Sequence, residues 1–133
     1  MSPRTGGTGS IKLEHVPFTT YIQIAAGQTV YMTHGTLGAA IAPRFIMITH
    51  AGLLRNLYAR SHANPGGAET YVFTLMLNGV ATALTCTIVA GNVANDTVNA
   101  VQVVPGDYVC IRCVASGGAN SVYISAACEE WSS

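Results

Sequence analysis

The sequence has few charged side chains. Six basic and six acidic residues make up 9 % of its 133 residues, against about 25 % in an average soluble domain. The signs cancel and the basic residues are scattered, which is not the charge pattern of a nucleic-acid-binding protein. So little charge leaves a single copy short of the polar surface that keeps a small domain soluble. We therefore expect copies of the same chain, or a larger assembly, to cover part of the surface.

The N-terminus lacks the apolar core of a signal peptide. Residues 1–16, MSPRTGGTGSIKLEHV, contain no such run after Arg4, so we expect synthesis in the cytoplasm without export. The first ten residues include many of Gly, Ser and Thr, a composition that forms no packed element alone. We predict an N-terminal arm over residues 1–16 and one domain over residues 17–133.

One long segment without charge invites a membrane interpretation. Residues 70–95 are mostly apolar, and a membrane helix needs roughly 20 such residues. However, Asn78-Gly79 in its middle favours the φ > 0 dihedrals of a tight hairpin turn. The flanks alternate with period two and are rich in β-branched and aromatic residues, as strands are. The segment is predicted to be a β-hairpin, and no membrane partner is expected.

Similar strand patterns occur along the rest of the chain. Short runs such as TTYIQI, TVYMTH, TVNAVQVV and YVCIRCVA are separated by Gly-, Pro- and Asn-rich turns. They predict about eight strands and no helix, in an all-β antiparallel sandwich or barrel. Several strands are apolar on both faces. In residues 108–115, Val109 and Ile111 alternate with Tyr108 and Cys110, so neighbouring subunits are expected to cover the outer face.

No motif indicates catalysis or a bound cofactor. Cys110 and Cys113 match C-x-x-C, but residues three apart on a strand point to opposite faces, and no second pair completes a zinc site. Surface or interface histidines are the favoured interpretation of His15, His34, His50 and His62, and the alternative is a metal site that assembles in space, for instance as a histidine ring on a trimer axis. No nucleophile elbow, phosphate loop or paired general acids are found. We expect a non-enzymatic protein with no metal and no cofactor.

The order of signals from Gly52 onward resembles a known module. The segments GLLRNLYAR, YVFTLMLNGVATALTCTIVAG, VNAVQVVPGDYVCIRC and SVYISAACEEW resemble a tumour-necrosis-factor-like jelly roll found in tailed-phage structural proteins. The resemblance covers about 80 residues. Its most specific parts are the hairpin and the turn at Pro105-Gly106-Asp107, where Asp107 is suited to accept backbone hydrogen bonds rather than to catalyse.

The resemblance implies a homotrimer in a bacteriophage virion. The expected function is a head-decoration (cement) protein on the capsid surface, bound to itself and to the major capsid protein. The alternative is the receptor- or glycan-binding head domain of a tail fibre. Candidate trimer-interface residues are Tyr71, Phe73, Tyr108, Val114, Tyr123 and Trp131. Candidate capsid-binding residues in the arm are Arg4, Thr5, Ile11, Lys12 and Leu13.

Overall fold

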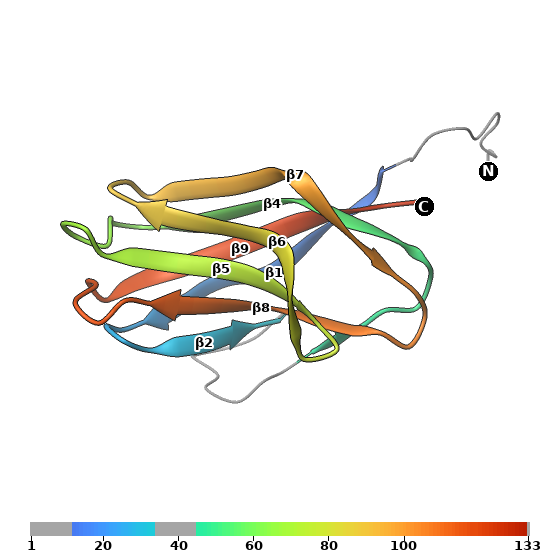
Figure 1. Ribbon diagram of the computed structural model, residues 1–133, viewed down its shortest axis with the longest axis horizontal. Coiled ribbons are helices and arrows are strands. Elements are labelled where there is room, and N and C mark those ends of the chain that lie inside the picture. The colour runs from blue at the N-terminus through green and yellow to red at the C-terminus, as the bar shows by residue number, and fades with distance from the viewer. Residues whose placement is uncertain (1–11, 34–44, 133) are drawn as a thin grey trace.

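Two antiparallel β-sheets make up the fold (Figure 1). The computed structural model describes residues 12–33 and 45–132, with the backbone alone for residues 12–21. This part of the chain contains nine strands and no helix, which confirms the prediction of an antiparallel all-β fold. The strands are β1 (Lys12–Ile24), β2 (Thr29–Met32), β3 (Ile46–Met47), β4 (Gly52–Ser61), β5 (Thr70–Leu77), β6 (Val80–Val89), β7 (Val93–Val103), β8 (Tyr108–Ala115) and β9 (Val122–Trp131).

The chain passes repeatedly from one sheet to the other. One sheet has the strand order β1-β9-β4-β7, and the other has the order β2-β8-β5-β6, with β3 also paired to β8. Only the β5–β6 connection is a hairpin between neighbours in one sheet. The edge strands β6 and β7 follow each other in sequence and lie side by side where the two sheets meet (Figure 1).

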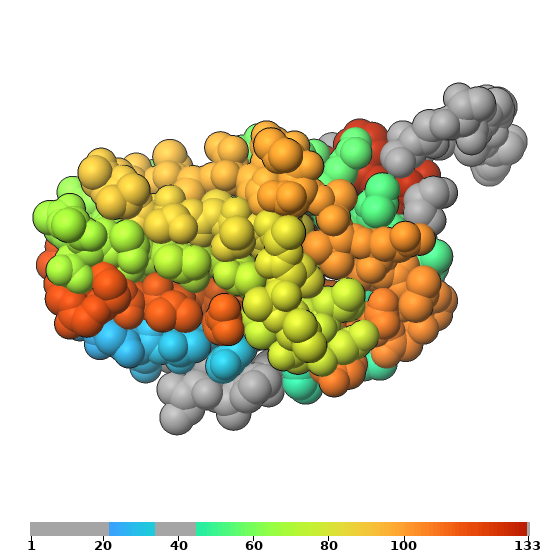
Figure 2. Space-filling model, viewed as in Figure 1, coloured from blue at the N-terminus to red at the C-terminus, as the bar shows by residue number. Residues whose placement is uncertain are grey.

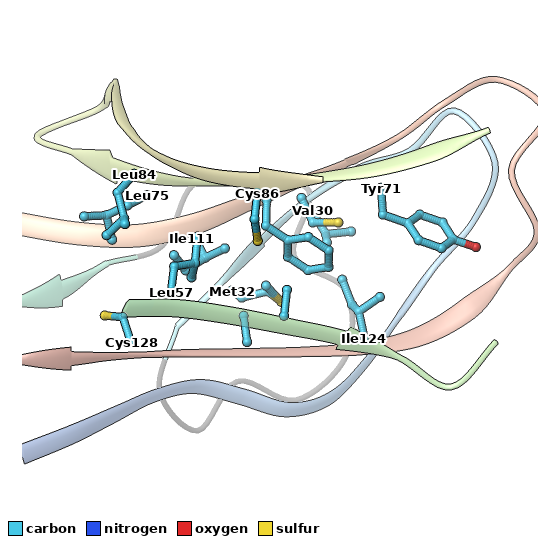
Figure 3. Close-up of a cluster of buried hydrophobic side chains, with 14 of the residues drawn as sticks. Val30, Met32, Leu57, Tyr71, Leu75, Leu84, Cys86, Ile111, Ile124 and Cys128 are labelled. Atoms are coloured by element: carbon cyan, nitrogen blue, oxygen red, sulfur yellow. The ribbon is translucent and has the colours of Figure 1, made fainter. Parts of the chain in front are cut away.

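The core lies between the sheets and follows the period-two pattern of the strands. Leu54, Leu57, Ile124 and Cys128 from one sheet meet large side chains of the other, as Figure 3 shows for part of this cluster. Tyr71 has no exposed surface, and its hydroxyl donates a hydrogen bond to the Asn120 carbonyl, which satisfies its polar end inside an apolar core. The two sheets thus bury one face each.

The β5–β6 hairpin has the turn that the sequence predicts. Asn78 and Gly79 have φ angles of 52° and 83°, both positive as a two-residue hairpin turn of type I′ requires. The segment from Thr70 to Val89 therefore forms two strands rather than a helix. Within the described part of the chain, no helix is long and apolar enough to cross a membrane.

Strand β1 begins earlier than the predicted boundary of the arm. Lys12 pairs with Trp131 and Val16 pairs with Cys128, so residues 12–16 belong to the sheet. The predicted arm of residues 1–16 is too long for this reason. Lys12 and Leu13 are strand residues, whereas Arg4, Thr5 and Ile11 lie outside the described residues.

Candidate functional site

Each sheet turns one face outward, and the two outer faces differ. We call the outward side of the β1-β9-β4-β7 sheet the four-stranded face and describe it from β4, β7 and β9. We call the outward side of β2, β3, β5, β6 and β8 the five-stranded face. Strand register places these side chains in rows. The four-stranded face consists of Leu53, Arg55, Tyr58, Arg60, Val93, Asn95, Ala100, Gln102, Tyr123, Ser125, Ala127, Glu129 and Trp131. The five-stranded face consists of Thr29, Tyr31, Phe45, Met47, Val72, Thr74, Met76, Thr85, Thr87, Val89, Tyr108, Cys110, Arg112 and Val114.

One end of the four-stranded face is a tightly connected group. The Arg55 guanidinium lies 3.9 Å from the centroid of the Trp131 ring, a cation–π geometry. Glu129 Oε1 accepts hydrogen bonds from Trp131 Nε1 at 3.0 Å and from Asn56 Nδ2 at 2.6 Å. Asn56 has a φ of 56° at a bulge in β4, a conformation that Asn tolerates better than most residues. Both charged side chains of this part of the face, Arg55 and Glu129, therefore contact Trp131.

The other end of the same face exposes aromatic rings. Tyr58 is 54 % exposed and Tyr123 is 45 % exposed, and the row containing Arg60 and Ser125 lies between them. The Tyr123 ring also approaches the His62 ring, with 5.7 Å between centroids, and the Tyr123 N–H donates to His62 Nδ1 at 3.0 Å. Amphipathic rings held on a rigid sheet are typical of surfaces that bind another molecule.

The five-stranded face carries a single charged side chain, Arg112 (Figure 2 shows this face). Arg112 pairs in register with Thr74 on β5 and with Tyr31 on β2. Thr74 Oγ1 lies 3.0 Å from Thr85 Oγ1, so hydroxyls satisfy each other across the strands. The face thus carries one positive charge and is hydroxyl-rich at its centre, where Thr85 and Thr87 are exposed and Thr74 is buried.

The β6–β7 edge exposes valine side chains. Val89 and Val93 flank the connection between these strands and are 52 % and 62 % exposed, and Val98 on β7 is 88 % exposed. Between Thr70 and Gly106 the sequence has only one charged residue, Asp96. Edge strands of monomeric proteins are usually protected by lysine, proline or a bulge. Strand β7 has a bulge at residues 97–99, but the side chain that this bulge exposes is Val98 rather than a charged residue.

The buried carboxylate of Asp96 holds the backbone of this bulge in place by hydrogen bonds. Residues 97–99 of β7 face only Asn56 of β4, and the Asp96 carboxylate accepts hydrogen bonds from the N–H groups of Val98, Asn99 and Thr85 and from Asn99 Nδ2. Burial acts to raise the pKa of Asp96, but these four donors outweigh it and lower the pKa to about 2. Because Thr85 lies on β6, the carboxylate also ties the two sheets together at this edge.

The structure divides the six candidate interface residues among three places. Tyr71 and Phe73 are fully buried in the core, so their assignment to a trimer interface is wrong. That assignment requires both side chains to point outward from β5, but they point inward. Successive side chains of a strand point to opposite faces, so a prediction that is wrong by one residue exchanges the inner and outer faces. Tyr108 and Val114 lie on the five-stranded face, and Tyr123 and Trp131 lie on the opposite, four-stranded face.

The thiols are internal. Cys86, Cys110, Cys113 and Cys128 are free and buried. Burial raises the pKa of Cys86 and Cys128 to about 12 and that of Cys110 to about 11, which keeps these groups protonated and poorly nucleophilic. Cys113 faces the core whereas Cys110 alternates to the other side of β8, as expected from their spacing. Across the described residues, no three His, Cys, Asp or Glu side chains are grouped so as to hold a metal ion.

The exposed β6–β7 edge was missed by sequence reasoning, although one signal pointed to it. The absence of charge from residues 70–95 predicts a hairpin, but the same signal also marks an edge without charged protection. Comparison with protein-family models and with curated proteins finds no match for this chain. Its function must therefore be inferred from the residues and geometry of these surfaces.

Proposed function

We propose that the chain is a non-enzymatic structural protein, a homotrimer that decorates and stabilises the head of a tailed bacteriophage. The observation that carries this proposal is the β6–β7 edge, which exposes Val89, Val93 and Val98 without any exposed charge. Such an edge in a lone monomer invites unwanted pairing. Cover by further copies of the chain removes that hazard and accounts for the low charge of the whole sequence.

The strand order supports a jelly roll, the fold of the resembled module. Strands β2 and β3 both pair with β8, so they are two parts of one strand position. The remaining order, β1-β9-β4-β7 facing β2-β8-β5-β6, is compatible with a double Greek-key wrapping. A jelly roll by itself names no function, so the proposal depends on the surfaces rather than on the fold.

A closed trimer needs two different patches on each subunit. Heterologous contacts close into a ring only when the rotation between patches is correct, and otherwise continue into a filament. The outer faces of a sandwich are opposed, so contacts between faces alone would stack subunits in a column. An edge placed against a face turns the next subunit and permits closure. We therefore place the β6–β7 edge of one subunit against the four-stranded face of the next.

The chemistry of these two patches is complementary. The edge offers Val98 and also Val93, which lies where the edge borders the four-stranded face, and the face offers the rings of Tyr58 and Tyr123. Aromatic rings and small apolar side chains form the centre of typical interfaces, with charged groups at the rim. Arg60, between the two rings, has its charge at the exposed surface and would lie at such a rim or bond to a neighbouring carbonyl.

Mixing two variants tests this arrangement. Val98→Asp damages the edge and Tyr58→Asp damages the face, so each variant alone should sediment as a monomer. A mixture contains one intact edge and one intact face and should form a heterodimer that cannot extend to a trimer. If the wild-type protein is a trimer and each variant alone is still a trimer, the edge-to-face contact is contradicted. A wild-type monomer would contradict the trimer itself.

A second candidate is the receptor- or glycan-binding head of a tail fibre. The exposed Tyr58 and Tyr123 rings favour it, because saccharides stack on aromatic rings that have polar neighbours such as Arg60. The two candidates differ in one measurement. Decoration requires binding to heads that lack the protein, whereas a fibre head binds host cells or glycans and leaves such heads untouched.

A further inference from the structure

We propose that one end of the sandwich is an apolar docking surface, by which each subunit sits on the protein shell of the head. We call it the turn end and define it by Phe45, Met47, Val80, Val104 and Tyr108. The shell as occupant rests on the function proposed above. The surface itself comes from exposure: Met47 and Val80 are 59 % and 66 % exposed, and Phe45 and Val104 are each 48 % exposed.

These side chains come from three segments that meet around Tyr108. The Phe45 ring packs edge-on against the Tyr108 ring, with 4.5 Å between centroids, and Met47 pairs with Tyr108 in register. Val80 follows the β5–β6 turn, where the Asn78 N–H donates to the Tyr108 carbonyl. Val104 precedes the β7–β8 turn that leads into Tyr108. The two turns lie next to each other at one end of the molecule (Figure 2).

The turn end is rigid, so its apolar side chains are presented in a fixed arrangement. Asn78 Nδ2 donates to Asp107 Oδ1 at 3.0 Å, and Asp107 Oδ2 accepts from the Val104 N–H at 2.9 Å. The Ile48 N–H donates to the Asp107 carbonyl at 2.8 Å, which ties the segment after β3 to the same turn. A rigid surface loses little conformational entropy when it binds, which favours docking.

The charge of this end indicates the chemistry of the partner. Within residues 45–48, 76–80 and 104–110 the only charged side chain is Asp107, and its carboxylate already accepts two hydrogen bonds. A partner that depended on several ion pairs would find only this one carboxylate here. The complementary surface is therefore an apolar, uncharged patch on a folded protein.

The start of strand β1 relates this surface to the expected partner. Strand β1 begins at Lys12, which pairs with Trp131 beside Leu53, and Gly52 pairs with Val103 next to Val104. Strand β1 therefore begins at the turn end. If the residues before Lys12 bind the shell, as the sequence leads us to expect, the turn end faces the same shell, and the two contacts share one partner.

Single glutamate substitutions test the docking surface. The variants are Val80→Glu and Val104→Glu, and both side chains are exposed enough that the fold should persist. The matched control is Ala68→Glu, which adds the same charge at an exposed position in the β4–β5 loop. The probe is purified heads that lack the decoration protein. Sedimentation equilibrium gives the mass of each variant, and co-sedimentation with heads gives its affinity.

The expected result is that all variants remain trimers, that Ala68→Glu binds heads like wild type, and that both valine variants bind at least about tenfold more weakly. Valine variants that bind as tightly as wild type would overturn the docking surface and leave the proposed function standing. Valine variants that fail to form trimers would assign the turn end to the subunit interface instead. A wild-type trimer that ignores heads would overturn the proposed function, and this docking surface with it.

Discussion

Asn78 and Asp107 join two turns that lie far apart in the sequence. Asn78 Nδ2 donates to Asp107 Oδ1, and Asn78 Oδ1 accepts from the Tyr108 N–H at 2.9 Å. The hydrogen bonds from Asn78 and from the Val104 N–H lower the pKa of Asp107, so it stays ionised at neutral pH. The hairpin turn and the Pro-Gly-Asp turn thus form one structural unit.

We predict that Asn78→Asp destabilises this unit. The change keeps a residue that tolerates positive φ and an acceptor for the Tyr108 N–H, but it replaces the donor to Asp107 with a second carboxylate. The melting temperature should fall by a few degrees. Adding Asp107→Asn exchanges the two side chains, so that the amide at position 107 donates to the carboxylate at position 78. The double variant should therefore recover most of the lost melting temperature. A double variant no more stable than the single one would contradict the direct bond.

Asp96 should make stability depend on pH in the acid range. Its pKa is about 2 in the folded protein against 3.8 ordinarily, so the folded state favours the ionised form. The stabilisation is complete above about pH 4 and is lost as the pH falls toward 2. Asp96→Asn should lower the free energy of unfolding at pH 7 by about 2 kcal/mol, since acceptors of several hydrogen bonds are removed.

Denaturant unfolding of wild type and Asp96→Asn from pH 7 to pH 2 measures this effect. The difference between the two proteins should be constant at neutral pH and should shrink below pH 4. Because other carboxylates titrate equally in both proteins, the difference isolates Asp96. A difference that does not change with pH would show that the carboxylate charge plays no part.

The four thiols should be inert in the native protein. All four are buried and burial raises the pKa of each, so little thiolate exists at neutral pH. A colorimetric thiol reagent should find none in native protein and all four after denaturation. Rapid reaction of Cys110, which lies on the outer side of β8, would show that this side opens in solution.

Tyr123 and Tyr108 should respond differently to substitution by a charged residue. Tyr123 lies on the four-stranded face, which the proposed trimer covers, and Tyr108 lies at the turn end. Tyr123→Asp should therefore sediment as a monomer, whereas Tyr108→Asp should remain a trimer and bind heads poorly. The opposite pattern would move the subunit interface to the five-stranded face.

Deletion of residues 2–11 should separate attachment from assembly. The deletion ends before β1, whose pairing with β9 begins at Lys12, so the sandwich and the trimer should persist. Attachment to heads should be lost or greatly weakened, because Arg4, Thr5 and Ile11 are removed. Deleted trimers that bind heads with the affinity of wild type would rule out an attachment role for these residues.

Sequence reasoning works well here where one residue type dictates the backbone. Asn78-Gly79 specifies a hairpin turn because few other pairs adopt two positive φ angles, and the structure has that turn. Gly106 has a φ of 97° in the Pro-Gly-Asp turn, and Asp107 accepts the backbone hydrogen bond expected of it.

It fails where the answer depends on distant contacts. Tyr71 and Phe73 have the size and aromatic character of interface residues, and only the packing of two sheets shows that they fill the core. The exposure of Val98 results from a bulge held by Asp96, a contact that pattern alone does not reveal. Likewise, Lys12 reads as part of a polar arm until its pairing with Trp131 is known.

The central claim is most directly tested by measuring solution mass and head binding in one experiment. Purified protein is sedimented alone and then with heads that lack it. The proposal predicts a species of three times the 13.8 kDa chain mass that binds heads at a fixed ratio and saturates. A monomer, or a trimer that stays in the supernatant while heads pellet, would contradict it.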